Sequence, residues 1–335
     1  MRAIISSDWH IKDDSPEDLQ LGLRLLDDAC KLAQIHQCRY VIVAGDFFHF
    51  KHRLGMRMLT SVYESLRAWK HRGVSFIIIK GNHDQPDVND SEYTPLRLLD
   101  SVATIVNTTR IVEEDDCVIA MVPWFPPGRF QAEINDAAQA VLSIHKPRIL
   151  ISHVSVKEGK VSPSNTKINQ PVRVEHLLPG IWTVYLGDYH AAQTVTTGAG
   201  SVHFLGAPRP TTHGDFDCLG MWLMTAEGKE LLSLPSRYPA FKTWRVDSKI
   251  DLPLRDFDQR DKNRIYVSNK MMPSVSLHYP TAVLILLEEE KIAVKDRLGG
   301  EVMSPLQVAL RWRELKKLPE EPYISEIRRL LGGAQ

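Results

Sequence analysis

Short apolar runs alternate with longer amphipathic stretches through the first two thirds of the chain. The apolar runs are rich in Val and Ile, which favours buried β-strands. They cover residues 2–7, 40–44, 74–79, 117–122, 148–152 and 183–186. The longer stretches repeat apolar residues every three or four positions, which predicts helices that bury one face. They cover residues 15–37, 57–71 and 130–144. This alternation predicts an α/β sandwich.

The helix predicted over residues 15–37 has a clear start. Ser15 is suited to cap the helix, and Pro16 is suited to its first position. One face of this helix is apolar and carries Leu19, Leu23, Leu26 and Cys30. The helix over residues 57–71 has a similar face, made of Leu59, Val62, Leu66 and Trp69. Both faces are expected to point inward and pack on a sheet.

The pattern changes after residue 190. Residues 193–234 predict β-hairpins, with turns at Gly198-Ala199-Gly200 and Glu227-Gly228-Lys229. A domain boundary is expected near Tyr238-Pro239. Beyond it, further strands are predicted over residues 243–246, 264–268 and 282–287.

The last 32 residues predict helices. Ser304 and Gln307 form a capping-box pattern at the start of a helix that runs to about residue 317, and a last helix is predicted over residues 323–331. The chain is therefore expected to have three parts. They are a main domain over residues 1–238, a small β-rich capping domain over 239–303 and a helical tail over 304–335.

The charge of the whole chain limits how the protein could bind a nucleic acid. Its 335 residues include 41 Lys and Arg and 41 Asp and Glu, and the sequence pI is about 7.2. A protein that binds DNA on its own usually has a strongly basic balance. We therefore expect DNA to bind at a limited part of this chain's surface, or a partner to share in DNA binding.

No segment resembles a signal peptide or a membrane span. Ile4 and Ile5 lead directly into polar residues, and the longest apolar run, Ala282–Leu287, is too short to cross a bilayer. Cys30 and Cys38 are expected to be buried thiols, and no pair of cysteines has metal-type spacing. The four cysteines are Cys30, Cys38, Cys117 and Cys218. These features predict a cytoplasmic protein without membrane association, in the host cytoplasm if the chain is viral.

Residues that can bind metal ions follow five of the predicted strands. In chain order these segments are Asp8-Trp9-His10, Gly45-Asp46-Phe47-Phe48-His49, Gly81-Asn82-His83-Asp84, His153 and Gly187-Asp188-Tyr189-His190. Sites in α/β sheets form outside the carboxyl ends of strands, so the five segments are expected to converge on one edge. Together they would supply carboxylate and amide oxygens and imidazoles, a set that suits hard divalent ions.

This ligand set suits the hydrolysis of a phosphodiester, which is anionic and has a poor leaving group. Two metal ions about 3.5–4 Å apart can screen its charge, ionise a water molecule and hold the attacking and leaving oxygens. One carboxylate must bridge the two ions, and Asp46 is the candidate. The glycines beside these ligands fit sharp turns at which the backbone comes close to metal or phosphate.

Each segment alone has a simpler explanation. Asp8-Trp9-His10 alone would be a surface loop, and Asp46 alone would be a turn or capping residue. His153 alone would be a core histidine, and Gly187-Asp188-Tyr189-His190 would be a turn. Gly81-Asn82-His83-Asp84 is more specific, because this tetrapeptide is uncommon directly after an apolar strand. The order of all five segments and their positions at strand ends favour the functional interpretation.

The series DxH, GDxxH, GNHD, a strand-end His and GxxH resembles the calcineurin-like metallophosphoesterases. Within them it is similar to the SbcD-type nucleases, the prokaryotic relatives of the meiotic-recombination nuclease. His49 follows Asp46 by three residues, where protein phosphatases carry a GDxVDRG pattern. Gly206-Ala207-Pro208-Arg209, followed by His213-Gly214-Asp215, resembles the segment after the last SbcD metal motif. The resemblance covers about residues 1–225, and the compact length is similar to that of bacteriophage members.

The resemblance implies a four-layer αββα metallophosphoesterase sandwich with a small α+β cap and C-terminal helices. It also implies a set of ligands for each of two ions. The first ion would be held by Asp8, His10, Asp46 and His190, and the second by Asp46, Asn82, His153 and Asp188. Asp188 departs from the common family pattern, which has His at this position. A carboxylate can still bind Mn²⁺ or Mg²⁺, so the departure bears on the affinity of the second site and not on the fold.

The resemblance implies three catalytic residues. His83 would contact the scissile phosphate and protonate the leaving oxygen, and Asp84 would orient His83 through a hydrogen bond. His49 would be a further imidazole that faces the phosphate. The candidate substrate-binding residues are Arg209, Lys51 and Arg53.

The implied function is a DNA exonuclease and endonuclease that acts in recombination, repair or replication and uses two Mn²⁺ ions, with Mg²⁺ as the alternative. An SbcC-like coiled-coil ABC-type ATPase is the implied partner, in a complex with a homodimer of this chain, and it could supply DNA binding. Residues 304–331 are expected to bind that partner or to pack on the cap. Two alternatives stay open. One is a small-molecule phosphodiesterase or nucleotidase, and the other is a catalytically silent scaffold, which the retention of nearly every ligand argues against.

Overall fold

The computed structural model describes residues 1–87, 93–160, 172–178, 182–213, 215, 220–246, 251, 254, 256–268 and 271–286. The chain divides into two compact units, Met1–Phe241 and Lys242–Gln335, and each is described by itself. The helices predicted over residues 304–317 and 323–331 lie outside the described residues, as does Cys218. Within the described parts of the chain, no helix has both the length and the apolar character needed to cross a membrane.

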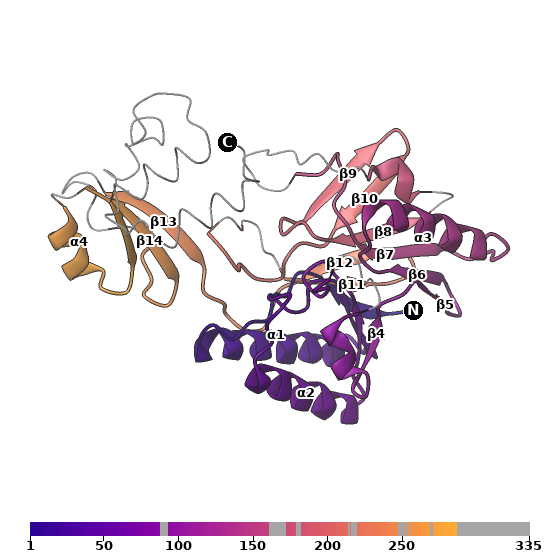
Figure 1. Cartoon of the computed structure of the whole chain (residues 1–335), viewed down its shortest axis with the longest axis horizontal. Coiled ribbons are helices and arrows are strands. Elements are labelled where there is room, and N and C mark those ends of the chain that lie inside the picture. The colour runs from indigo at the N-terminus through magenta and orange to yellow at the C-terminus, as the bar shows by residue number, and fades with distance from the viewer. Residues whose placement is uncertain are drawn as a thin grey trace, which may run out of the picture. The chain divides into compact units, whose positions relative to one another are not determined.

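The first unit contains two six-stranded sheets (Figure 1). The strands of the first sheet are β1 (Ala3–Ser6), β2 (Tyr40–Ala44), β3 (Ser75–Ile79), β4 (Ala103–Val106), β11 (Met221–Met224) and β12 (Lys229–Leu232). Their order is β12-β11-β1-β2-β3-β4. Strands β1 to β4 are parallel, and β11 is antiparallel to both of its neighbours. The carboxyl ends of β1, β2 and β3 therefore lie at the same end of the sheet.

The second sheet also has six strands and a parallel centre. Its strands are β5 (Arg110–Glu113), β6 (Val118–Val122), β7 (Arg148–His153), β8 (Thr183–Gly187), β9 (Gln193–Thr197) and β10 (Gly200–Phe204). Their order is β5-β6-β7-β8-β10-β9, with a parallel centre and an antiparallel strand at each edge. The hairpins predicted within residues 193–234 are β9–β10 and β11–β12.

Helices cover the outer face of each sheet. The first sheet is covered by α1 (Pro16–Ile35) and α2 (Met56–His71), and the second by α3 (Pro127–Ala140) and a 3₁₀ helix (Val174–Leu177). A third apolar cluster fills the space between the sheets. The layers are therefore helix, sheet, sheet and helix, which confirms the predicted αββα sandwich.

The unbroken apolar runs in the sequence follow from this layering. Successive residues of a strand point to opposite faces of a sheet. In β1, Ile4 belongs to the cluster under the helices and Ile5 to the cluster between the sheets. Both faces of the strand are buried, so both positions must be apolar.

Several predicted details of the first unit are confirmed, and the differences from the prediction are local. Ser15 caps α1 by accepting a hydrogen bond from the backbone N–H of Asp18 (3.1 Å), and Pro16 begins the helix, as predicted. Cys30 and Cys38 are buried, also as predicted. Helix α3 ends at Ala140, four residues before the predicted end. Strands β4 and β5 were not predicted, because four residues with partly exposed positions give too short a pattern.

The second unit has a three-stranded sheet in the order β13-β14-β15. Its strands are β13 (Phe241–Val246), β14 (Lys262–Val267) and β15 (Val283–Leu286), and they match the three predicted strands. A short helix, α4 (Met272–His278), was not predicted and has a proline in its first turn. Val246, Ile265, Val267 and Val275 form the centre of a small separate core.

Candidate metal centre

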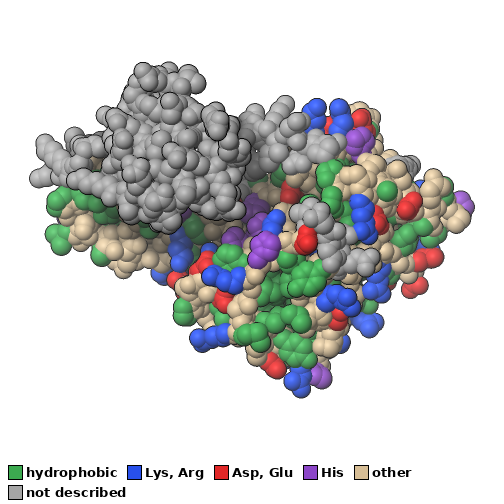
Figure 2. Space-filling model, in the orientation of Figure 1, with side chains coloured by type: hydrophobic (Ala, Val, Ile, Leu, Met, Phe, Trp, Pro, Cys, Tyr) green, Lys and Arg blue, Asp and Glu red, His purple; other side chains and the backbone are tan. Residues whose placement is uncertain are grey.

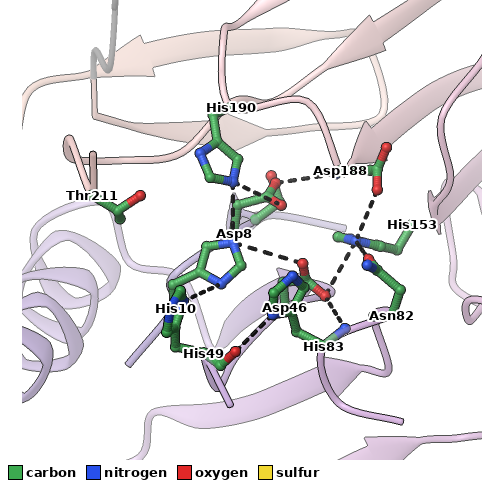
Figure 3. A network of polar contacts seen from close by, with 12 residues as sticks. Asp8, His10, Asp46, His49, Asn82, His83, His153, Asp188, His190 and Thr211 are labelled. Carbon is green, nitrogen blue, oxygen red and sulfur yellow. Dashed lines mark hydrogen bonds and ion pairs between the residues drawn. The ribbon is translucent and has the colours of Figure 1, made fainter. Parts of the chain in front are cut away.

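Five strands, three from the first sheet and two from the second, deliver the predicted metal ligands to one place. The structure joins all seven side chains in a single network of polar contacts (Figure 3). They are Asp8 and His10 after β1, Asp46 after β2, Asn82 after β3, His153 at the end of β7, and Asp188 and His190 after β8. The predicted convergence of strand ends is therefore present.

The backbone of these loops is strained. Four candidate ligands have positive φ angles, a conformation that costs residues other than glycine of order 1–3 kcal/mol. They are Asp8 (55°), His10 (44°), Asp46 (53°) and Asp188 (94°). Strain of this kind collects at functional sites, where it aims a side chain that a relaxed loop would turn away.

Three glycines make room for the ligands. A Cβ atom on Gly45 would lie 2.1 Å from Nδ1 of His153, and one on Gly81 would lie 2.2 Å from Oδ1 of Asp46. A Cβ atom on Gly187 would lie 2.2 Å from a backbone carbonyl oxygen. Real Cβ atoms cannot approach this closely, so the ligands can converge only because these positions have no side chain.

Two of the histidines show which ring nitrogen is available to an ion. Nδ1 of His153 lies 2.8 Å from the carbonyl oxygen of Ala44, and Nδ1 of His190 lies 2.9 Å from Oδ1 of Asp215. A carbonyl or an ionised carboxylate can only accept, so both Nδ1 atoms donate. In the neutral rings Nε2 then has a free lone pair directed at the network. Metal-binding histidines are usually held in this way.

His10 has an imidazole neighbour at each of its ring nitrogens. Its Nδ1 lies 3.4 Å from Nδ1 of His49, and its Nε2 faces Nε2 of His190 at 3.1 Å. His10, His49 and His83 also have ring nitrogens close enough together to hold an ion. If His10 binds through Nε2, however, its Nδ1 carries the proton and cannot bind a second ion. The network, and not this group of three rings, is therefore the better candidate for a metal site.

The first site comprises Asp8, His10, Asp46 and His190. Nε2 of His10 lies 3.7 Å from Oδ2 of Asp46, and Nε2 of His190 lies 4.0 Å from Oδ1 of Asp8. Oδ1 of Asp8 is buried and has no hydrogen-bond partner among the described residues. A buried carboxylate oxygen without a donor is costly unless a cation binds it, so these residues fit a divalent ion.

The second site comprises Asp46, Asn82, His153 and Asp188. Three oxygens surround Nε2 of His153: Oδ1 of Asn82 at 2.9 Å, Oδ1 of Asp46 at 3.3 Å and Oδ1 of Asp188 at 3.8 Å. Figure 3 shows Asn82 and Asp188 on opposite sides of this nitrogen. Asp46 presents one carboxylate oxygen to each site, as a bridging ligand must.

The electrostatics of the centre favour bound positive charge. Burial raises the pKa of Asp8, partly against the charge of His153. Burial would also raise the pKa of Asp46, but contacts with His153 and His10 outweigh it and hold the pKa below its ordinary value. Burial would lower the pKa of His153, yet the carboxylates around it raise the pKa well above its ordinary value. Burial lowers the pKa of His10 to about 3, so this ring is neutral and ready to bind an ion.

Asp84 makes different contacts from those predicted. Its buried carboxylate accepts hydrogen bonds from three backbone N–H groups, those of Gly81 (2.9 Å), Phe47 (3.2 Å) and Phe48 (3.1 Å). His83 is oriented instead by the carbonyl oxygen of His49, 2.6 Å from its Nδ1. The predicted hydrogen bond between Asp84 and His83 is therefore wrong. Burial and the charge of Asp46 raise the pKa of Asp84 to about 6, against the three hydrogen bonds that favour its ionised form.

His83 lies beside the two sites. Its backbone N–H donates to Oδ1 of Asp46 (2.9 Å), and its ring centroid is 4.8 Å from that of His10. Because Nδ1 is engaged by the His49 carbonyl, Nε2 is the ring nitrogen left for a substrate. His49 has its own ring next to His10, and burial lowers its pKa, with a further contribution from Lys12.

The three candidate substrate-binding residues lie in different settings. Arg53 is 72% exposed and forms an ion pair with Asp14 (3.5 Å), and Lys51 is partly exposed. Arg209 is only 6% exposed, and its Nη1 donates to the carbonyl oxygen of Pro210 (3.4 Å). Their roles stay predictions, and the burial of Arg209 leaves little of its guanidinium within reach of a substrate.

Two residues that support the ligands were not predicted. Asp215 accepts from His190 and also from the backbone and hydroxyl of Thr211 (2.7 and 2.6 Å). Burial would lower the pKa of His190, but Asp215 raises it to about 9. The hydroxyl of Ser155 donates to Oδ2 of Asp188. Asp215 lies in a segment that the sequence comparison singled out, whereas no motif marks Ser155.

A comparison with protein families supports a phosphoesterase relationship for the first part of the chain. Residues 1–154 match the calcineurin-like phosphoesterase family. This segment includes the candidate residues from Asp8 to His153, whereas Asp188 and His190 follow it. The match is to the phosphoesterase family as a whole, so the SbcD-type subfamily stays a prediction. The comparison with curated proteins found no match.

Two solved structures illustrate the similarity. A dimetal phosphatase from Danio rerio is 11% identical with a TM-score of 0.45, over 70% of this chain and 99% of that one. A nuclease, MPE, from Pseudomonas putida is 16% identical with a TM-score of 0.34, over 67% of this chain and 84% of that one.

Proposed function

We propose that this chain is a metal-dependent nuclease that hydrolyses phosphodiester bonds in DNA. The observation that supports this best is a pair of oxygen- and imidazole-rich sites that share the carboxylate of Asp46. A shared carboxylate can hold two divalent ions close together, and such a pair can stabilise the attacking and leaving oxygens of an in-line displacement at phosphorus. When bound, the two ions would neutralise phosphate charge and make a water molecule nucleophilic near neutral pH.

The ligand set also bears on the ions. Each site combines carboxylate oxygens with one or two imidazoles, which suits Mn²⁺ and is acceptable to Mg²⁺. The three carboxylates, Asp8, Asp46 and Asp188, leave a net positive charge when two divalent ions are bound, and this charge would attract an anionic phosphodiester. We therefore propose Mn²⁺ as the preferred ion.

His83 is the proposed general acid. The His49 carbonyl accepts from Nδ1, so a second proton on the ring must sit on Nε2. The backbone contact with Asp46 keeps this ring next to the shared carboxylate, where the leaving oxygen would develop charge. A positioned acid of this kind usually contributes about 10²–10⁴-fold to the rate.

The surroundings of His49 support a polymeric substrate. Lys12, Lys51 and Arg53 lie on the two loops next to this ring, and the charge of Lys12 contributes to its lowered pKa. In Figure 2, histidine side chains reach the surface with Lys and Arg side chains close by. Cations beside the centre can hold phosphates that flank the one being cleaved, which a small substrate would not need.

A direct assay tests the proposal. The purified chain is incubated with linear duplex DNA, plasmid and cyclic nucleotides in the presence of Mn²⁺, Mg²⁺ or a chelator. We expect Mn²⁺-dependent cleavage of DNA that the chelator abolishes, with cyclic nucleotides cleaved slowly or not at all. Preferential cleavage of cyclic nucleotides would support a small-molecule phosphodiesterase instead. No metal-dependent cleavage of any substrate would support a silent scaffold.

The neutral charge of the chain supports a partner that contributes DNA binding. We propose the SbcC-like ATPase for this role, in a complex with two copies of this chain. Deletion of the residues after Val302 is expected to spare Mn²⁺-dependent cleavage of a small phosphodiester but to abolish co-purification with the ATPase. A complex that survives this deletion would exclude the tail as the binding segment.

A further inference from the structure

Asp188 differs from the other two candidate carboxylate ligands, Asp8 and Asp46, in its surroundings. Its side chain is 19% exposed, whereas that of His153 is fully buried. Oδ1 of Asp188 faces the second site, 3.8 Å from Nε2 of His153. Oδ2 accepts a hydrogen bond from the hydroxyl of Ser155. The two oxygens of this carboxylate therefore have different partners.

The fold brings Ser155 and Asp188 together. Strands β7 and β8 run in parallel, and their pairing ends with His153 opposite Gly187. Ser155 follows the end of one strand by two residues, and Asp188 follows the other directly. The two segments therefore leave the sheet side by side, and the Ser155 hydroxyl lies within reach of the Asp188 carboxylate.

The segment that carries Ser155 is firmly packed. The hydroxyl of the buried residue Tyr189 donates to the carbonyl oxygen of Val156 (2.8 Å), next to Ser155. The ring of Tyr189 lies so close to Gly159 that a Cβ atom there would come within 2.2 Å of it. Both ends of the hydrogen bond are therefore anchored, because Tyr189 also adjoins Asp188 in the chain.

We propose that Ser155 is a positioning residue for the second metal site. Its hydroxyl holds Oδ2 of Asp188, so that only Oδ1 is presented to the ion. This inference rests on the proposed function, since it requires an ion at Asn82, His153 and Asp188.

The hydrogen bond limits how the Asp188 carboxylate can bind an ion. An imidazole offers a single atom to an ion, whereas a free carboxylate can turn and bind through both oxygens. With Oδ2 held by Ser155, Asp188 supplies a single donor atom, as an imidazole would. The hydrogen bond also draws some negative charge away from the ion. The second site can then keep an open position for substrate.

Calorimetric titration of the metal-free full chain with MnCl₂ tests this role without an activity assay. We expect two binding events in the wild type, and Asp188→Ala identifies the event that belongs to the second site. Ser155→Ala should weaken that event by about 10–100-fold, a typical effect of removing a group that orients a ligand. The other event should be unchanged. Ser155→Thr keeps the hydroxyl and should restore the affinity.

Two further variants control for loss of packing. Ser152→Ala removes a hydroxyl from β7, the strand that precedes Ser155, and should leave both events intact; this hydroxyl donates to the carbonyl oxygen of Val122 (2.6 Å). Ser155→Cys nearly keeps the side-chain volume but donates weakly, so it should behave like Ser155→Ala. In an Asp188→Ala background, Ser155→Ala should have no further effect on Mn²⁺ binding.

The outcomes separate the two proposals. A wild-type chain that binds no Mn²⁺ would refute the proposed function and this inference together. Two events in the wild type and the same two affinities in Ser155→Ala would refute only the role of Ser155. Equal weakening of both events would also refute it, since that result indicates a general loosening of the centre.

Discussion

The two candidate sites share Asp46 but are supported in different ways. In the first site, the two histidines are backed by side chains from other loops, His10 by His49 and His190 by Asp215. Each supporting side chain can be altered without changing the main chain. The metal affinity of this site should therefore depend on side chains that single substitutions can remove.

The second site relies more on the main chain. His153 is backed by the carbonyl oxygen of Ala44, and Gly45 and Gly187 give its ring the space it needs. No side-chain substitution removes that carbonyl. The weak point of this site is Asp188, a partly exposed carboxylate. The contrast indicates that the first site can be tuned through the side chains behind its two histidines, and the second mainly at Asp188 and the Ser155 hydroxyl that holds it.

The largest expected effect comes from removing what the two sites share. Asp46→Ala should abolish both Mn²⁺ binding events and lower turnover by about 10³-fold or more, because the ions supply several kcal/mol of transition-state stabilisation. Calorimetry and a nuclease assay on the same sample measure both effects. Loss of only one event would show that Asp46 serves a single site.

A second variant separates metal binding from proton transfer. His83 belongs to neither site, so His83→Ala should keep both Mn²⁺ events and lose about 10²–10⁴-fold in turnover. The assay compares single-turnover rates at saturating Mn²⁺. Near-wild-type turnover would mean that His83 is not the general acid.

The two sites should respond differently when a supporting side chain is weakened. Asp215→Asn should lower affinity in the first site by about 10–100-fold and leave the second nearly unchanged. The comparison is made by MnCl₂ titration against the wild type. An equal effect on both sites would argue that Asp215 stabilises the whole loop and not His190.

The smallest expected effect is a change with pH in the thermal stability of the metal-free protein. Burial would lower the pKa of His190, but the hydrogen bond with Asp215 and the charges of Asp8, Asp215 and Asp46 raise it to about 9, above the ordinary value of about 6.5. The stability that this contact contributes should be fully present below pH 6.5 and lost as pH rises through 9. Thermal unfolding in chelator between pH 6 and pH 10 measures it. The difference in Tm between wild type and Asp215→Asn should shrink across this window, and a constant difference would contradict the account.

The positions of the ligands could be predicted from the sequence because each one follows a strongly apolar strand. The ends of β1, β2, β3, β7 and β8 are fixed by buried Val and Ile runs, and parallel strands place their carboxyl ends together. Asp8, Asp46 and His153 were located in this way.

The supporting contacts could not be predicted, because they depend on how loops from distant parts of the chain pack. Asp84 lies next to His83 in sequence, yet its carboxylate reaches the N–H groups of Phe47 and Phe48 in another loop. Ser155 meets Asp188 across two strands, and a lone serine carries no periodic or motif signal. Contacts of this kind are set by tertiary structure and not by local pattern.

Crystals grown with Mn²⁺ and measured at the manganese absorption edge test the central claim most directly. The account predicts two anomalous peaks about 3.5–4 Å apart, both next to Asp46. One should lie beside His10 and His190, and the other beside Asn82 and His153. A single peak, or a peak among the rings of His10, His49 and His83, would contradict the account.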